Sequence, residues 1–93
     1  MKYTVRYSKN FVKSLKKVQQ LKVFKPERLR LIIKLISSGE KLDSRFRDHK
    51  LSGNMASYRE CHVSSDILLI YEIDSEVLIL TLINIGSHSN LFK

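Results

Sequence analysis

The sequence has little cysteine, proline and glycine, with one, one and three residues respectively, and it has no tryptophan. A single cysteine excludes an internal disulfide and a cysteine-based zinc site, and it suits a reducing compartment. No stretch approaches the roughly 20 consecutive apolar residues of a membrane span. The alternating pattern that starts at Lys2 leaves no room for a signal peptide. We therefore expect a cytoplasmic protein with no membrane partner.

The chain is too short for two domains. Its 93 residues fit one small domain with one core, so residues 1–93 are predicted to form a single domain. A hydrophobic content of 43% and a charged content of 28% are typical of a globular protein rather than a disordered one. No internal repeat is present, and a large cofactor domain beside a catalytic one is excluded by size.

Acidic residues are scarce, with 9 Asp and Glu against 17 Lys and Arg, which gives a formal net charge of +8. Residues 1–50 hold 15 basic and 4 acidic side chains and carry +11, whereas residues 51–93 hold 2 and 5 and carry −3. A positive field of this size attracts polyanions such as nucleic acid. A basic surface that only maintains solubility would have the same composition.

The N-terminal half predicts one strand and two helices. Alternation over residues 2–7 predicts a half-buried strand, and Ser8 is a suitable N-cap for a helix that runs to about residue 21. Pro26 fits the first turn of a second helix, and Gly39 fits its end. The apolar side chains of that helix follow the spacing of one buried face: Leu29, Ile32, Ile33 and Ile36.

The C-terminal half predicts a sheet. Residues 40–57 are polar and form the longest predicted irregular segment, and strands follow at 58–63, 67–73 and 77–85. This order predicts an α+β domain, in which an N-terminal helical hairpin packs on one face of a mostly antiparallel sheet of about four strands.

The last two strands are apolar on both faces, and two helices can cover only one. We therefore expect part of an apolar set to remain on the other face or edge as a protein-binding surface: Leu68, Ile70, Leu78, Leu80 and Leu82.

Three histidines, His49, His62 and His88, lie in or beside polar segments of the second half. Isolated surface histidines are usually without function, but two chemistries would use all three. With Asp66 or Glu60 they offer imidazole and carboxylate metal ligands, although their spacing matches no zinc signature. Alternatively, they offer the base and the acid that cut RNA by attack of the 2′-hydroxyl on the adjacent phosphorus, with cations that stabilise the phosphoryl charge.

Strand alternation places Glu60 and His62 on one face and Cys61 on the other. We expect Cys61 to be buried in the core rather than to act as a nucleophile, and the other two side chains to lie on the polar face. Asp66 follows the hairpin turn and either orients the His62 imidazole or only forms the turn. Aromatic side chains either stack on an unpaired base or pack in the core: Tyr58, Tyr71 and Phe92.

Four blocks of the second half resemble a known family. Residues 47–53 (RDHKLSG), 58–63 (YRECHV), 66–71 (DILLIY) and 86–92 (GSHSNLF) are similar, in order and spacing, to the YafQ branch of the RelE/ParE toxins. These are the toxin halves of bacterial type II toxin–antitoxin pairs. The N-terminal strand and basic helices match the family only in pattern.

The resemblance implies a RelE-like α+β fold and an mRNA interferase, an endoribonuclease that cuts mRNA, typically on the ribosome. It also implies inhibition by a cognate antitoxin, with operator DNA bound only through that antitoxin. By position, it implies that His49, His62, Asp66, His88 and Phe92 are catalytic or substrate-contacting residues, and Glu60 falls where relatives carry an acidic residue. From this and from charge we predict two sets. The catalytic residues are His49, His62, Asp66 and His88; the substrate-binding residues are Phe92, Glu60, Arg59, Arg47 and Lys50.

The sequence also departs from the family pattern. Relatives commonly have Asp at the position of Glu60, a Trp and a Lys within residues 54–57, and Pro at the position of Ser65. The missing Trp and Lys remove a stacking or phosphate contact, which affects potency and cleavage preference more than the class of reaction.

We therefore predict a metal-independent mRNA interferase that needs no cofactor. His88 and His49 are expected to transfer protons, His62 and Asp66 to position the substrate, and Phe92 to stack on a base. Arg59 or Arg47 would stabilise the phosphoryl charge. Basic side chains of the first half would hold phosphates without reading sequence: Lys13, Lys16, Lys17, Arg45, Arg47 and Lys50.

Two other functions fit the same fold. One is a ParE-like toxin that binds a protein such as DNA gyrase and cuts nothing, and the other is an inert relative that binds only its antitoxin or operator DNA. The three histidines favour the nuclease, because neither alternative uses them. A smaller, acidic antitoxin is the expected protein partner in each case where the chain is a toxin.

Overall fold

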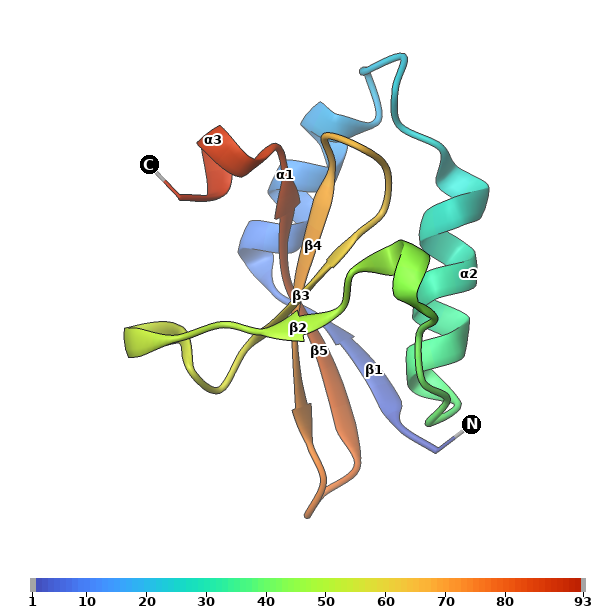
Figure 1. Cartoon of the computed structure of the whole chain (residues 1–93), viewed down its shortest axis with the longest axis vertical. Helices are drawn as coiled ribbons and strands as arrows, with labels where there is room; N and C mark the ends of the chain where they lie inside the picture. Colours follow the sequence, from blue (N-terminus) through green and yellow to red (C-terminus); the bar gives the residue numbers. More distant parts are fainter. Residues whose placement is uncertain (1, 93) are drawn as a thin grey trace.

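The computed structural model describes residues 2–92 and has the predicted α+β architecture (Figure 1). The chain begins with a strand and two helices, continues through a long segment with little regular structure, and ends with three strands and a short helix. In order, the elements are β1 (Thr4–Tyr7), α1 (Lys9–Val18), α2 (Pro26–Ser37), η1 (Ser44–Phe46), β2 (His49–Lys50), η2 (Gly53–Met55), β3 (Arg59–His62), β4 (Leu68–Asp74), β5 (Ile79–Gly86) and α3 (His88–Leu91). No helix among residues 2–92 is long and apolar enough to span a bilayer.

The sheet has five strands in the order β1-β5-β4-β3-β2, one more than the approximate number expected. The additional strand is β2, which lies inside the segment predicted to be irregular. It is only two residues long, and it pairs His49 with Glu60 and Lys50 with Arg59. The β1–β5 pair is parallel and the other pairs are antiparallel, as the prediction of a mostly antiparallel sheet requires.

Both long helices pack on the same face of the sheet. Phe11 of α1 and Ile32 of α2 are buried in a single core cluster together with Cys61 of β3, Leu69 of β4 and Leu82 of β5. The helical hairpin on one face is therefore confirmed. The first helix is shorter than predicted, because the chain leaves α1 after Val18 through a turn.

The prediction of an uncovered apolar sheet face is wrong. Leu80 and Leu82 belong to the core beneath the helices, and Leu78 is exposed in the β4–β5 turn. Only Leu68 and Ile70 point to the second face, where they are 3% and 2% exposed. Near them, Leu91 of α3 packs directly over Gly86, the partner of Leu68 in β5.

Ser8 joins the start of α1 to the sheet. Its hydroxyl oxygen accepts a hydrogen bond from the Phe11 backbone N–H at 3.0 Å, which confirms the predicted N-cap. The same hydroxyl donates to the carbonyl oxygen of Ile83 at 2.6 Å, and Ile83 lies at the irregularity where β5 passes β4. One side chain thus fixes both the start of the helix and its position on β5.

Ser8→Ala should lower the free energy of unfolding by about 1–2 kcal/mol, because it removes the helix cap and the bond to Ile83 together. Urea unfolding followed by circular dichroism measures the change. Ser75→Ala, in the exposed β4–β5 turn, is the control and should leave stability nearly unchanged. Equal effects of the two substitutions would contradict this role of Ser8.

Candidate active site

Three of the predicted catalytic residues line one cleft on the second face of the sheet. The cleft has a volume of about 550 Å³, and we call it the histidine cleft. It is formed by β3, the β3–β4 turn, the start of β4 and the beginning of α3. Its lining residues are Glu60, His62, Ser65, Asp66, Leu68, Ser87, His88 and Ser89.

The register of the sheet brings these segments together. Leu68 pairs with His62 on one side and with Gly86 on the other. Because neighbouring strands lie about 4.8 Å apart, His62 and the start of α3 are separated by the width of two strand spacings. His62 and His88, 26 positions apart in the sequence, therefore face the same cleft.

The short helix α3 positions His88 and Phe92. The Ser87 hydroxyl caps it by accepting from the Asn90 backbone N–H at 3.3 Å. The rings of His88 and Phe92, one helical turn apart, contact each other with their centroids 4.9 Å apart and their planes tilted by 41°. Phe92 therefore lies beside the histidine cleft.

His49 is held next to this cleft by Glu60. Its Nδ1 lies 2.8 Å from the Arg47 carbonyl oxygen, and its Nε2 lies 3.5 Å from Oε1 of Glu60. Both neighbours of the imidazole are therefore oxygen atoms. Glu60 itself is 5% exposed. It lies beside His49 and also lines the histidine cleft, and its role in substrate binding stays a prediction.

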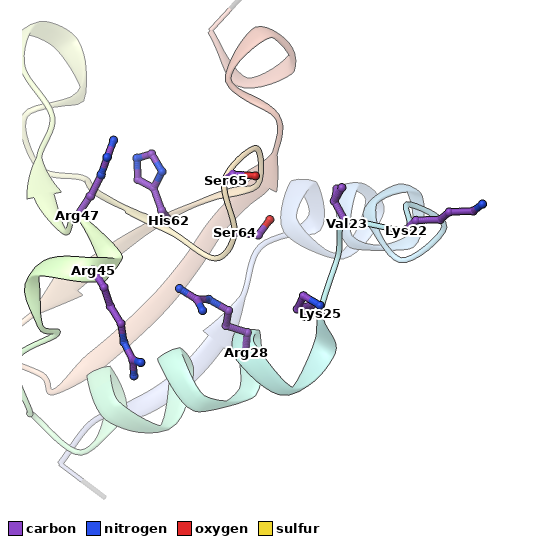
Figure 2. A pocket seen from close by; sticks show the side chains of 9 residues that line it. All are labelled: Lys22, Val23, Lys25, Arg28, Arg45, Arg47, His62, Ser64 and Ser65. Atoms are coloured by element: carbon purple, nitrogen blue, oxygen red, sulfur yellow. The ribbon is translucent and has the colours of Figure 1, made fainter.

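A second, basic cleft of about 660 Å³ adjoins the first (Figure 2). His62 and Ser65 line both clefts, so the two are continuous. We call this one the basic cleft, since five cationic side chains and no carboxylate line it. Its residues come from the α1–α2 loop, the start of α2, η1 and the β3–β4 turn: Lys22, Val23, Lys25, Arg28, Arg45, Arg47, His62, Ser64 and Ser65.

The sequence identified only part of this cationic set. Arg45 and Arg47 line the basic cleft as expected, but Lys13, Lys16 and Lys17 lie on α1 and line neither cleft. Lys50 is exposed on β2 and also lines neither cleft. The sequence analysis missed the cationic side chains on either side of Pro26: Lys22, Lys25 and Arg28. In the sequence, the only indication that these three side chains act together is that they lie close to Pro26, at the predicted start of a helix.

Arg59 lines neither of these two clefts, and its role at the phosphoryl group stays a prediction. It lies on the opposite side of β3, where its Nη2 is 2.8 Å from Oδ2 of Asp48. The Tyr71 hydroxyl donates to the other oxygen of the same carboxylate. The hydrogen bond that Arg59 donates to Asp48 raises the pKa of Arg59. Burial, followed by the hydrogen bond donated to Asp48, raises the pKa of Tyr71. Both side chains are therefore donors bound to one carboxylate.

Cys61 and Tyr71 both belong to the core. Cys61 is fully buried, and burial raises the pKa of its thiol, so the thiolate needed for nucleophilic attack is disfavoured. Tyr71 is packed in the same cluster and is not available to stack on a base. Among residues 2–92, no group of three or more His, Cys, Asp or Glu side chains is arranged to hold a metal ion.

Comparisons with known proteins agree with this fold. A family model described as "Bacterial toxin of type II toxin-antitoxin system, YafQ" matches residues 3–93. The mRNA interferase toxin YafQ of Escherichia coli K12 is 29% identical over 92 residues, which cover 99% of this chain and 94% of that protein. The corresponding toxin of E. coli B is 30% identical over 88 residues, with 95% and 94% covered.

Solved structures give the same result. A metal-bound toxin from Helicobacter pylori is 34% identical with a TM-score of 0.88, and the match covers 97% of this chain and 99% of that one. The toxin in the E. coli DinJ–YafQ toxin–antitoxin complex is 26% identical with a TM-score of 0.86, with full coverage of both chains. These matches define the class of the chain as a toxin of a type II toxin–antitoxin system. Within that class it belongs to the YafQ family.

Asp48→Ala should lower the free energy of unfolding by about 2 kcal/mol, because it leaves the Arg59 guanidinium and the Tyr71 hydroxyl without their shared acceptor. Arg59→Ala and the double variant complete a cycle, in which the two losses should be markedly less than additive. Glu76→Ala is the control, since this carboxylate is exposed in the β4–β5 turn. Equal losses from Asp48→Ala and Glu76→Ala, measured by urea unfolding, would contradict the assignment.

Proposed function

We propose that this toxin is an endoribonuclease that cuts mRNA, on the ribosome, by attack of the RNA 2′-hydroxyl and without a metal ion. The observation that carries the proposal is the continuity of the histidine cleft with the basic cleft through His62 and Ser65. Proton-transfer groups and a carboxylate-free row of cations thus lie along one path. A phosphodiester that enters the basic cleft reaches the imidazoles with its charge neutralised.

His49 and His88 are the proposed proton-transfer groups. Attack of the 2′-oxygen on phosphorus requires a base that takes the hydroxyl proton and an acid that gives a proton to the departing 5′-oxygen. His49, held between the Arg47 carbonyl oxygen and Glu60, is the proposed acid. His88, exposed at the start of α3, is then the base.

The remaining residues position the RNA. His62 and Asp66 lie in the histidine cleft beside His88 and orient the reacting phosphate and its ribose. Arg47, which shares the basic cleft with His62, stabilises the negative charge that develops on the phosphoryl oxygens. Phe92, in contact with the His88 ring, stacks on a base next to the cut. This arrangement takes single-stranded RNA, whose bases are free to stack.

The chemistry predicts that mRNA with a 2′-deoxy sugar at the scissile position resists cleavage, because it lacks the attacking oxygen. Purified toxin is added to ribosomes that carry the mRNA, and the cut ends are mapped; the same mRNA without ribosomes tests the ribosome requirement. Toxin treated with EDTA and then desalted should cut at an unchanged rate. Equal cutting of the deoxy substrate, or loss of activity in the EDTA-treated toxin, would overturn the mechanism and favour a metal-dependent one.

His88→Ala should lower the cleavage rate about 10²–10⁴-fold, the usual effect of losing one proton-transfer group. The melting temperature should not change, since His88 is exposed on the short terminal helix. Asn90→Ala, an exposed position on the same helix, is the matched control and should cut at the wild-type rate. A His88→Ala toxin with full activity would exclude the ring from proton transfer.

We also propose that a smaller acidic antitoxin binds this chain across its N-terminal half. That half carries +11 and also holds five of the large apolar side chains that are exposed: Tyr7, Val12, Leu21, Val23 and Leu31. An amphipathic acidic partner complements both properties. In the E. coli DinJ–YafQ toxin–antitoxin complex, a toxin similar to this chain along its whole length is bound to an antitoxin.

Co-expression with the neighbouring gene of its operon should yield a complex whose melting temperature rises with added antitoxin, because a ligand of the folded state stabilises it by mass action. Differential scanning fluorimetry at a series of antitoxin concentrations measures the shift. High salt should weaken binding, since the contact is partly electrostatic. Recovery of the toxin alone from the co-expression would count against this partner.

A further inference from the structure

Two donor atoms in the basic cleft have no hydrogen-bond partner. Within residues 2–92, only the Arg28 Nε and the Ser64 Oγ are buried side-chain polar atoms without one. Both residues line the basic cleft, and Figure 2 shows their side chains directed into it from α2 and from the β3–β4 turn. Leaving such donors buried and unpaired destabilises a folded protein, and more so when the donor belongs to a charged group. The presence of two such donors beside one cleft points to a ligand that accepts hydrogen bonds.

The surrounding structure holds Arg28 in place without neutralising it. Its guanidinium carbon lies 5.2 Å from the centre of the Phe46 ring, and this ring is buried. Stacking on an aromatic face fixes the plane of a guanidinium group while its N–H groups stay free to donate. None of the ion pairs found among residues 2–92 involves Arg28; they join Arg45 to Asp43, His49 to Glu60, and Arg59 to Asp48.

Ser64 is fixed by the turn in which it lies. Its backbone N–H and that of Val63 both donate to the carbonyl oxygen of Ile67, at 3.2 and 2.8 Å. The hydroxyl is therefore the group that Ser64 has left to offer the cleft. It comes from the same turn as Ser65 and Asp66, so its position is tied to that of the histidine cleft.

We propose that Arg28 and Ser64 form a subsite for one backbone phosphate of the RNA, next to the reacting phosphate and not itself cut. A phosphate offers several acceptor oxygens and a negative charge, which match a fixed guanidinium, a hydroxyl and the cationic wall of Lys22, Lys25 and Arg47. The proposal rests on the proposed function, because continuity with the histidine cleft through His62 and Ser65 is what makes RNA the ligand.

RNA is favoured over an acidic peptide for two reasons. The basic cleft shares His62 and Ser65 with the histidine cleft, so a strand held in the first can continue into the second. The cleft wall is polar and cationic, with Val23 its only large apolar residue, whereas an antitoxin segment would also need apolar contacts. The subsite thus fits a phosphodiester strand, which is held mainly through its charges.

Binding of an uncleaved RNA tests the subsite apart from catalysis. The probe is a fluorescent single-stranded oligonucleotide with 2′-O-methyl sugars, which blocks the 2′-hydroxyl reaction, and affinity is read by anisotropy. Arg28→Lys keeps the positive charge but loses the planar fork and Nε, and Ser64→Ala loses only the hydroxyl. We expect about a tenfold loss of affinity for the first and a smaller loss for the second. Arg30→Lys, exposed on α2 and outside both clefts, is the matched control and should bind as the wild type.

Two further readouts separate a specific subsite from general attraction. If both side chains hold one phosphate, the Arg28→Lys and Ser64→Ala losses should be less than additive in the double variant. Replacing phosphates one at a time by neutral methylphosphonates should identify one position that matters in the wild type and no longer in the Arg28→Lys variant. Wild-type affinity of Arg28→Lys, with an unchanged melting temperature, would overturn the subsite even if the toxin cuts RNA.

The remaining outcomes are also decisive. Arg28→Lys that binds RNA normally but loses the acidic antitoxin would show that the subsite belongs to the protein partner, and the proposal would be wrong. A toxin that cuts no RNA, but whose affinity for the probe falls with these substitutions as expected, would contradict the proposed catalysis and retain the phosphate subsite.

Discussion

The pairing of Leu68 with His62 on one side and Gly86 on the other is the constraint on which the site depends. A shift of one residue in either pairing would turn His62 toward the core and expose Cys61 or Leu69 to solvent. Those two side chains are fully buried beneath the helices. The free energy gained by burying the core therefore also fixes the geometry of the histidine cleft.

The two faces of the sheet have different roles: one packs against the helices to form the core, and the other forms the histidine cleft. Beneath the helices, the apolar core is bounded at the β2–β3 edge by one half-buried carboxylate, Asp48, which binds Arg59 and Tyr71. On the other face, the same two strands present His49, Glu60 and His62. Two residues adjacent in the sequence thus have different roles. Asp48 anchors the edge strand β2, and this anchoring fixes the position of His49.

Local patterns predicted much of this structure. The Ser8 cap, the burial of Cys61 and the polar face shared by Glu60 and His62 all follow from spacing over a few residues. The face of Leu80 and Leu82 could not be predicted in this way, because a strand that is apolar at almost every position has no alternation to follow. The two residues of β2 are likewise too few to show the alternation of apolar and polar side chains that predicts a strand.

The family resemblance supplied most of the candidate site, and long-range pairing decided the rest. The guanidinium group of Arg59 is suited to binding phosphate. Only the structure reveals that Arg59 is already paired with Asp48. Arg28 and Ser64 are 36 positions apart in the sequence, and no periodic pattern links them. Their convergence on one cleft depends on how α2 packs against the β3–β4 turn.

The parallel pairing of β1 with β5 has a consequence for the time at which the toxin becomes complete. Thr4 pairs with Ile79 and Tyr7 with Leu82, so the first strand has no partner until nearly the whole chain has been synthesised. Closing so long a loop is also entropically costly, which slows the formation of such contacts. The helix that positions His88 is made later still. A ribosome that translates this message therefore carries a nascent chain without a finished cleft, and the proposed activity can arise only after the last residues have emerged.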